Sequence, residues 1–282
     1  MLLQRIALSP LRDVVPYFRL ISAPVSFILF SFVIWFTAKF IDQRKIADYG
    51  IFYSKEWVLD FVFGLLLGIF LISFVFVFEY SLGWITIVDY CYAANDKNFI
   101  LALLESVFLY IYVGYYEETL SRGYLLKNIS EGMNFRKSGP IFAIIFAVLF
   151  TSFLFGLGHA DNPNATFNGW WNIIIVGSLL AYTFVITKSL AIPIGIHITW
   201  NFFQGSVYGF PVSGNPTSVT FMQIHQGGNP LWTGGDFGPE AGLVIYFVAV
   251  FWLILLHIWL RFRKRSLIVD KNFARYTSDT SD

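Results

Sequence analysis

The sequence predicts an all-α, polytopic membrane protein in which about seven or eight helices cross the bilayer. Its 282 residues are 56% hydrophobic and only 13% charged, and the mean hydropathy is +0.63. Soluble domains carry about 25% charged residues, so this composition is typical of a membrane protein. Aromatic residues make up 20% of the chain, including 32 Phe, which suits a surface that faces lipid.

Seven stretches can span the membrane, because a crossing helix needs about 20 predominantly apolar residues. They are residues 20–40, 57–80, 99–126, 140–158, 171–187, 190–208 and 241–260. The stretch SLGWITIVDYCYAA, residues 81–94, is a candidate for a partial eighth span. The stretch RIALSPLRDVVPYFRL, residues 5–20, has arginines between short apolar pieces, which is typical of an interfacial segment rather than a signal peptide.

We expect one helical membrane domain, since the sequence has neither internal repeats nor low-complexity tracts. An N-terminal interfacial segment and the first spans make up residues 1–98. A core that carries the polar motifs follows over residues 99–209. Residues 210–282 hold a Gly-rich loop, the last span and a basic tail.

Lysine and arginine predict the orientation, because cytoplasmic loops carry an excess of both. They cluster at residues 44–55, 127–137 and 261–265, and Lys188 lies between two spans. We therefore expect a cytoplasmic C-terminus and a Gly-rich loop on the opposite side. The side of the N-terminus stays open, because three arginines precede the first span.

Charge and cysteine content exclude several kinds of partner and site. A net charge of +1 provides no basic stripe to neutralise phosphates, so we expect no nucleic-acid partner and only the lipid bilayer around the spans. The lone Cys91 excludes an intrachain disulfide and a multi-cysteine metal site.

The segment EETLSR, residues 117–122, places three charges in an apolar background. Helical residues four apart share a face, so Glu118 and Arg122 can form an ion pair while Glu117 points about 100° away. A buried ion-pair network that fixes the helix register would explain such a triplet structurally. Ionisable groups inside a membrane are more often functional, which makes Glu117 the leading candidate.

Two further polar groups interrupt predicted spans. FGLGH places Phe155 and His159 one turn apart at the end of a span, and HITWN places His197 and Asn201 on one helix face. Taken alone, His159 fits an interfacial or capping residue. The His197 and Asn201 pair fits equally well as a hydrogen-bonded contact between helices.

A helical hairpin that turns near Arg136 would bring the first two groups together. Glu117 and His159 each lie about twenty residues, or roughly 30 Å, from that turn, so His159 is the leading candidate to face Glu117. His197 lies only roughly 14 Å from the turn at Lys188. Glu117, His159 and His197 can lie at the same depth in the membrane if the hairpin extends beyond the membrane into the cytoplasm. We therefore expect a water-filled cavity within the membrane, close to its cytoplasmic face.

The chemistry of this set is that of a hydrolase. A carboxylate facing an imidazole can take a proton from water, and His197 with Asn201 offers donors for an oxyanion. Glu117, His159 and His197 could instead hold one divalent metal, such as zinc, whose bound water is the nucleophile. Both alternatives stay open at this point, and no cofactor is certain.

The three groups resemble, in this order, the motifs of the CPBP family of intramembrane proteases (CAAX protease or Abi, linked to bacteriocin processing), which includes the type II CAAX prenyl endopeptidases. The family pattern EExxxR, FxxxH and HxxxN or HxxxB occurs here as EETLSR, FGLGH and HITWN, without departure. The resemblance covers residues 99–209. TGGDFGPEAG also resembles a segment that precedes the last span in many bacterial members.

The resemblance implies an intramembrane endopeptidase that hydrolyses a membrane-associated peptide or protein. It implies that Glu117 and His159 activate water. His197 and Asn201 would then stabilise the oxyanion.

Glu118 and Arg122 would be a supporting pair in such a protease. The family has been described both as metalloproteases and as metal-independent glutamate proteases, so a metalloendopeptidase remains one of its two forms. A bacterial member is expected in the plasma membrane, with a leader peptide or small membrane protein as substrate, because nothing in the sequence shows prenyl recognition. No oligomeric state is predicted.

Two other functions use the same residues. One is a non-catalytic bacteriocin-immunity or membrane scaffold protein. The other is a transporter in which Glu117, His159 and His197 relay protons or hold an ion. Transporters often show internal pseudo-symmetry, and none is apparent in the sequence, so the full motif set favours the protease.

Overall fold

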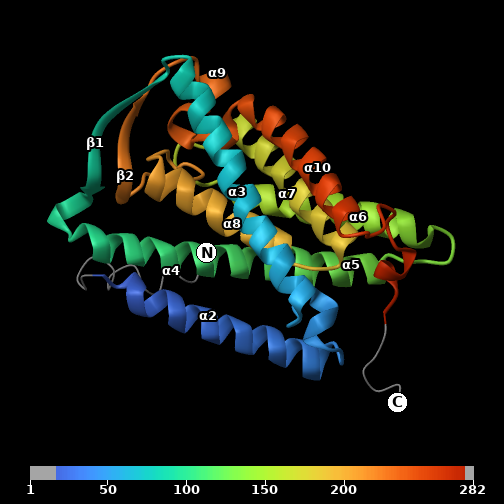
Figure 1. Ribbon diagram of the computed structural model, residues 1–282. Coiled ribbons are helices and arrows are strands. Elements are labelled where there is room, and N and C mark those ends of the chain that lie inside the picture. Colours follow the sequence, from blue (N-terminus) through green and yellow to red (C-terminus); the bar gives the residue numbers. More distant parts are fainter. Residues whose placement is uncertain (1–16, 277–282) are drawn as a thin grey trace.

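The computed structural model describes residues 17–276 as a bundle of long helices with a small two-stranded ribbon at one end (Figure 1). Within this range, six helical stretches are long and apolar enough to cross a membrane. They are Arg19–Ile41, Lys55–Ser81, Phe99–Gly132, Gly139–Leu157, Phe167–Thr187 and Val244–Phe262. The predicted class of helical, polytopic membrane protein is therefore confirmed. The predicted interfacial segment, residues 5–20, lies largely outside the described residues.

The helices follow one another with short connections. The α-helices are α2 (Arg19–Phe36), α3 (Lys55–Ser81), α4 (Phe99–Glu118), α5 (Lys127–Gly132), α6 (Gly139–Leu157), α7 (Phe167–Thr187), α8 (Ala191–Phe202), α9 (Pro230–Thr233) and α10 (Val244–Phe262). Turns of π-helix cover Thr37–Ile41, Thr119–Leu126 and Phe203–Val207. Turns of 3₁₀-helix cover Ile46–Tyr49, Ala94–Asp96, Gly235–Phe237, Pro239–Ala241 and Lys271–Ala274.

The sixth predicted span, residues 190–208, is shorter than expected. Helix α8 has 12 residues, and the π-helical turn Phe203–Val207 adds five. The chain then turns at Gly209, whose φ of +75° favours glycine, and a Cβ there would lie 2.3 Å from the carbonyl oxygen of Met222. Because most of α8 is buried by protein, its apolar sequence reflects packing among helices rather than contact with lipid.

Residues 81–94 do not form a partial span, so this prediction is wrong. They contain strand β1 (Ile85–Ala93), which pairs antiparallel with β2 (Val219–Gln226) from Ile85 opposite Gln226 to Ala93 opposite Val219. The sequence ITIVDYCYA is rich in β-branched and aromatic residues, which favour a strand. The segment predicted as a Gly-rich loop therefore contributes one strand of the ribbon.

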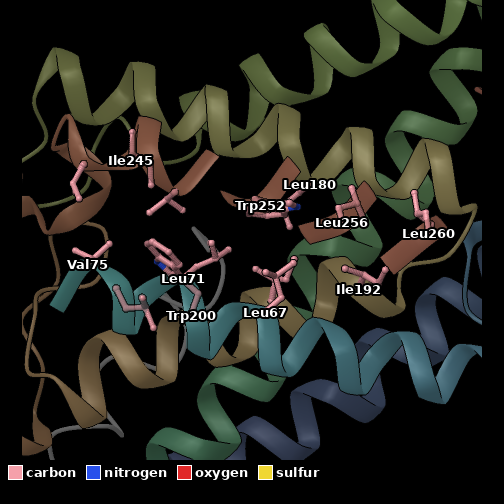
Figure 2. Packing of buried hydrophobic residues seen from close by; sticks show 14 residues of the cluster. Leu67, Leu71, Val75, Leu180, Ile192, Trp200, Ile245, Trp252, Leu256 and Leu260 are labelled. Atoms are coloured by element: carbon pink, nitrogen blue, oxygen red, sulfur yellow. The ribbon is translucent and has the colours of Figure 1, made fainter. Parts of the chain in front are cut away.

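The largest apolar core lies between α3, α7, α8 and α10 (Figure 2). Leu71 of α3, Ile192 and Trp200 of α8, and Trp252 and Leu256 of α10 are all buried there. In a membrane these side chains exchange contacts with lipid for contacts with one another, so the core is stabilised by van der Waals packing. This packing fixes α8, the helix that carries the third motif.

Helices α3 and α8 approach each other closely through small residues. A Cβ at Gly64 would lie 2.6 Å from the Ile192 carbonyl oxygen, and one at Gly195 would lie 2.7 Å from that of Phe61. A Cβ at Gly68 would lie 2.2 Å from Thr199 Oγ1. Small residues permit such contacts between membrane helices, which are stabilised by van der Waals packing rather than by the hydrophobic effect.

Replacing Gly68 by Ala is expected to destabilise the protein, because the added methyl group forces α3 and α8 apart. Overpacking of this kind costs about 1–3 kcal/mol. The measurement is the midpoint of thermal unfolding in detergent. Gly132→Ala is the matched control, since a Cβ at Gly132 meets nothing within 4 Å. An equal midpoint for the two variants would contradict the close packing.

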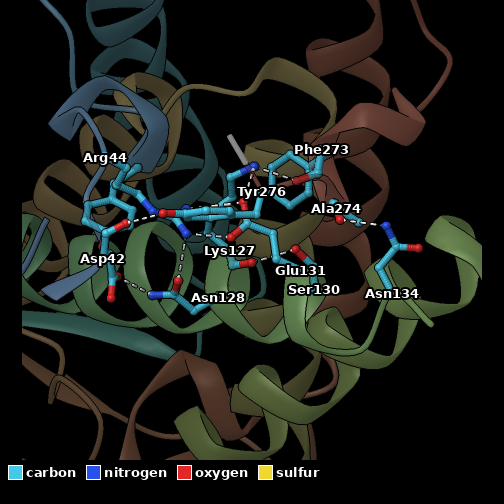
Figure 3. Close-up of polar contacts among 11 residues, drawn as sticks. Asp42, Arg44, Lys127, Asn128, Ser130, Glu131, Asn134, Phe273, Ala274 and Tyr276 are labelled. Carbon is cyan, nitrogen blue, oxygen red and sulfur yellow. Dashed lines mark hydrogen bonds and ion pairs between the residues drawn. The ribbon is translucent and has the colours of Figure 1, made fainter. Parts of the chain in front are cut away.

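Polar contacts join the loops at the end of the bundle away from the ribbon (Figure 3). Arg44 Nη2 lies 2.6 Å from Glu131 Oε2. Lys127 Nζ and Asn134 Nδ2 donate to the carbonyl oxygens of Phe273 and Ala274, at 2.5 and 2.8 Å. The loop after α2, the α4–α5 helix and the C-terminal segment therefore meet at this end.

The loop after α7 belongs to the same end. Lys188 forms an ion pair with Asp270, and Leu190 donates its N–H to the Gly50 carbonyl at 3.0 Å. We define the basic face as residues 39–55, 127–138, 188–190 and 261–276. Three of these segments correspond to clusters of lysine and arginine, and the fourth contains Lys188.

Candidate active site

A cavity of about 520 Å³ lies among α2, α4, α7, α8 and α10. The four residues predicted to be catalytic all line it: Glu117, His159, His197 and Asn201. Glu117 comes from the end of α4, His159 from the turn after α6, and the other two from α8. Segments up to 84 residues apart in the sequence thus present their polar side chains to one space.

An ion pair lies directly behind this cavity. Arg122 Nη1 donates to Glu118 Oε1 at 2.9 Å, and both side chains are almost completely buried, with 1% and 0% exposure. The predicted pairing of Glu118 with Arg122 is therefore present. Arg122 Nη2 also donates to the Gly177 carbonyl of α7 at 3.2 Å, and its guanidinium lies 4.2 Å from the ring centre of Phe155. This arginine joins α4, α6 and α7.

His197 connects the ion pair to the cavity. Its Nδ1 lies 2.8 Å from Glu118 Oε1, and its Nε2 lies 3.8 Å from Glu117 Oε2. Since Glu118 is paired with Arg122 and accepts hydrogen bonds as a carboxylate, Nδ1 of His197 carries the proton in this contact. The distance from Nε2 to Glu117 exceeds a direct hydrogen bond, and a water molecule can contact both groups.

His159 is oriented by the backbone of its own helix. Its Nδ1 lies 2.8 Å from the Phe155 carbonyl oxygen, so Nδ1 donates and Nε2 of the neutral ring keeps a lone pair. The spacing in the sequence favours His159 as the residue facing Glu117. Both line the cavity, but the imidazole that lies 3.8 Å from the Glu117 carboxylate is that of His197.

A π-helical turn overlaps the first of the three motifs, and another lies just after the third. The turn Thr119–Leu126 begins directly after Glu118, and the turn Phe203–Val207 begins two residues after Asn201. Short π-helical segments within α-helices are frequent at functional sites. The first also makes α4 and α5 one continuous helix of 34 residues, Phe99–Gly132.

Much of the cavity lies along α4, on the ribbon side of Glu117. At 1.5 Å per residue, Glu117 lies roughly 22 Å from the end of its helix at Gly132, on the basic face. From there the cavity extends toward the ribbon, along Val113, Tyr110 and Ser106 of α4. The long helix beyond Glu117 agrees with the expected distance of this residue from the turn near Arg136, and the depth of the cavity relative to the cytoplasmic face stays a prediction.

The three residues predicted as metal ligands do not form a metal-binding cluster. Among residues 17–276, no three His, Cys, Asp or Glu side chains lie close enough together to share one metal ion. Glu117, His159 and His197 line the same cavity without meeting this requirement.

The cavity wall includes Glu240, which sequence reasoning missed. Its Oε2 accepts from Gln204 Nε2 at 2.7 Å, and its Oε1 accepts from the Ser213 N–H at 3.1 Å and from the Ser213 hydroxyl at 3.2 Å. Only 4% of Glu240 is exposed. The signal available in the sequence was a pair of acidic residues, Asp236 and Glu240, among the glycines of TGGDFGPEAG, just before the last span.

Stability is expected to depend on pH through Glu240. Burial raises the pKa of its carboxyl from the ordinary value of 4.5 to about 7, so the folded protein holds this proton more tightly than the unfolded chain. The free energy of unfolding should then decrease by about 3 kcal/mol as the pH rises from below 4.5 through 7. Unfolding midpoints in detergent between pH 5 and 8 measure this slope.

The matched variants separate this effect from other titrations. Glu240→Gln should remove most of the slope, whereas Asp236→Asn, at an exposed position in the same segment, should retain it. An unchanged slope in Glu240→Gln would show that other groups cause the pH dependence.

Comparison with known proteins tests the resemblance stated above. The family model described as type II CAAX prenyl endopeptidase Rce1-like matches residues 99–203. All three motifs, residues 117–122, 155–159 and 197–201, fall within this range. No curated protein and no solved structure matches the chain. The resemblance to the CPBP family is thus confirmed by a match that covers the motif-bearing part of this integral membrane protein, residues 99–203, which are similar to the Rce1-like type II CAAX prenyl endopeptidases.

Proposed function

We propose that this protein is an intramembrane endopeptidase that hydrolyses a peptide bond with water activated by Glu117 and His159. One observation carries the proposal: a carboxylate, two imidazoles and an amide from separate elements line one cavity, with a buried ion pair behind them. The Rce1-like match supports the same class of reaction.

The first step is the attack of water on the scissile carbonyl carbon. The Glu117 carboxylate accepts one proton of the water, and the lone pair on His159 Nε2 orients the same molecule by accepting its second hydrogen. The water oxygen forms a bond to the carbonyl carbon, and the carbonyl electron pair moves to oxygen. General base catalysis of this kind contributes about 10²–10⁴ in rate.

The resulting oxyanion needs hydrogen-bond donors on the other side of the cavity. The Asn201 amide provides one. His197 provides a second when its Nε2 is protonated, a form stabilised by the Glu118 carboxylate on Nδ1. The carbonyl then re-forms, the C–N bond breaks, and the proton held by Glu117 passes to the departing amine.

The proposed substrate is a peptide or a small membrane protein. The cavity has a polar side and an apolar side, the latter lined by Leu180, Ile196 and Trp252. Its size lies in the range of about 300–1,000 Å³ that is typical of ligand sites. We place the protein in a bacterial plasma membrane, with the C-terminus in the cytoplasm, because the basic face contains the C-terminal segment.

The decisive experiment compares peptides in membranes from cells that express wild-type protein or Glu117→Gln. A substrate should accumulate uncut in the variant, and its fragments should appear only with the wild type. Identical profiles would favour the non-catalytic immunity or scaffold function. Loss of ion-dependent uptake in the variant, without any change in peptides, would favour the transporter.

Metal dependence is tested separately. We expect purified protein to retain cleavage after treatment with 1,10-phenanthroline and to contain far less than one equivalent of zinc, because the donors do not form a shared site. Loss of cleavage that zinc restores would instead assign Glu117, His159 and His197 as metal ligands.

A further inference from the structure

From the catalytic residues the cavity extends toward the ribbon, and its apolar side reaches Leu180 and Trp252 in the interior of the bundle. Its lining includes the first turns of α2, residues between 106 and 117 of α4, and residues from 212 to the start of β2 at Val219. No residue of the basic face lines it. Within the described chain, the path from the site therefore leads toward the ribbon.

The mouth of the cavity is formed by the segment that precedes β2. Of the residues that line the cavity, those classed as exposed are Asn215, Pro216 and Ser218. The Ser218 carbonyl accepts from the Ala94 N–H at 2.9 Å, and Ser213 is held by Glu240. The mouth is thus fixed to the ribbon on one side and to the segment before α10 on the other.

The mouth and the basic face lie at opposite ends of the bundle. Among residues 17–276, every lysine and arginine except Arg19, Lys97 and Arg122 lies on the basic face. Lys97 forms an ion pair with Glu105 at 3.1 Å, near the start of α4, and Arg122 is buried behind the catalytic site. Because lysine and arginine concentrate on the cytoplasmic side of short loops, the basic face is cytoplasmic.

We propose that the substrate polypeptide enters this site from the extracytoplasmic side of the membrane, past Asn215, Pro216 and Ser218. This inference rests on the proposed function and specifies its substrate class: an exported peptide, or the extracytoplasmic segment of a membrane protein. A cytosolic protein with a modified C-terminus would meet the closed, basic face instead.

The lining between the mouth and the site suits a polypeptide main chain. Hydroxyl and amide groups recur along this path, from Ser22, Ser26, Ser106, Asn162 and Ser206. The hydroxyls of Ser106 and Ser206 donate to the Leu103 carbonyl and to Ser106, and their lone pairs can still accept from peptide N–H groups. The amide of Asn162 can both donate and accept, as peptide N–H and carbonyl groups require in a site shielded from water. An extended segment of the substrate can therefore pass from the mouth to Glu117 with its backbone hydrogen-bonded.

The natural Cys91 tests the sidedness in the wild-type protein. It is the only cysteine of the chain and lies exposed on β1, at the ribbon end. A membrane-impermeant maleimide added to intact cells should label it fully. Labelling only after the cells are permeabilised would place the ribbon in the cytoplasm and overturn the proposal.

A matched pair of variants in a Cys91→Ser background locates the mouth. Ser218→Cys and Ser266→Cys both replace exposed serines, the first at the mouth and the second on the basic face. In intact cells, the impermeant reagent should label Ser218→Cys alone. The adduct at position 218 should reduce cleavage at least tenfold, whereas Ser266→Cys, labelled after permeabilisation, should cleave as before. Full cleavage by the labelled Ser218→Cys protein would exclude this mouth.

A third measurement is independent of activity. Ser206 is buried in the cavity wall, so Ser206→Cys should react with a small impermeant thiosulfonate supplied from outside. A bulky maleimide placed first on Ser218→Cys in the double variant should prevent this reaction. Unchanged reactivity of position 206 would refute the route. If the labels react as expected at positions 218 and 206 but no cleavage is found, the proposed protease function is contradicted, whereas the access route from outside is supported.

Discussion

Replacing Glu117 by Gln is expected to reduce kcat by about 10²–10⁴ and to leave KM nearly unchanged. Gln has the shape of Glu but cannot accept a proton from water. Because the exposed fraction of Glu117 is only 5%, an uncharged side chain also fits this position without loss of stability. The measurement is the initial rate of cleavage of the substrate identified from membranes, at equal amounts of inserted protein.

Two further variants make this result specific. His159→Ala should produce a loss of similar size, because it removes the lone pair that orients the water. Glu56→Gln is the control, since this carboxylate lies exposed at the start of α3, far from the cavity lining. Full activity in either Glu117→Gln or His159→Ala would contradict the mechanism, whatever the control shows.

The proposed catalytic residues could be predicted from the sequence, because the spacing of polar residues along a helix determines which of them lie on the same face. A pair at positions i and i+4 of a helix shares a face in any fold, so Glu118 with Arg122 and His197 with Asn201 were accessible before any tertiary information. The apolar background made each polar group conspicuous. Functional residues are thus easier to identify in the sequence of a membrane helix than in that of a soluble helix, where polar residues are common.

Other parts of the site depend on contacts that spacing does not encode. The Glu118 to His197 contact joins residues 79 positions apart, and it decides which nitrogen of His197 carries the proton. The ribbon forms only when two distant segments pair, and neither sequence alone predicts a strand clearly. Residues 81–94 are also apolar enough to resemble a membrane span. Glu240 is conspicuous only once Gln204 and Ser213 are seen to surround it.

Replacing Arg122 by Met is expected to destabilise the protein by about 3–5 kcal/mol, because Glu118 remains as a buried carboxylate without its cation. Arg122 also donates to the Gly177 carbonyl and lies over the Phe155 ring, so α4 loses its connections to α6 and α7. The midpoint of thermal unfolding in detergent should decrease by roughly 10 °C. Cleavage should decrease as well, since His197 is oriented by Glu118.

The double variant Glu118→Gln with Arg122→Met separates stability from catalysis. Removing both charges should recover much of the lost stability, because no unpaired charge stays buried. The interaction energy between positions 118 and 122, obtained from the double-mutant cycle, should be about 0.5–3 kcal/mol. Cleavage should stay low, since a neutral amide does not stabilise protonated His197 as a carboxylate does. If the two single effects simply add in the double variant, the pair is not coupled. If cleavage returns with stability, Glu118 only fills space, and the orientation of His197 has another source.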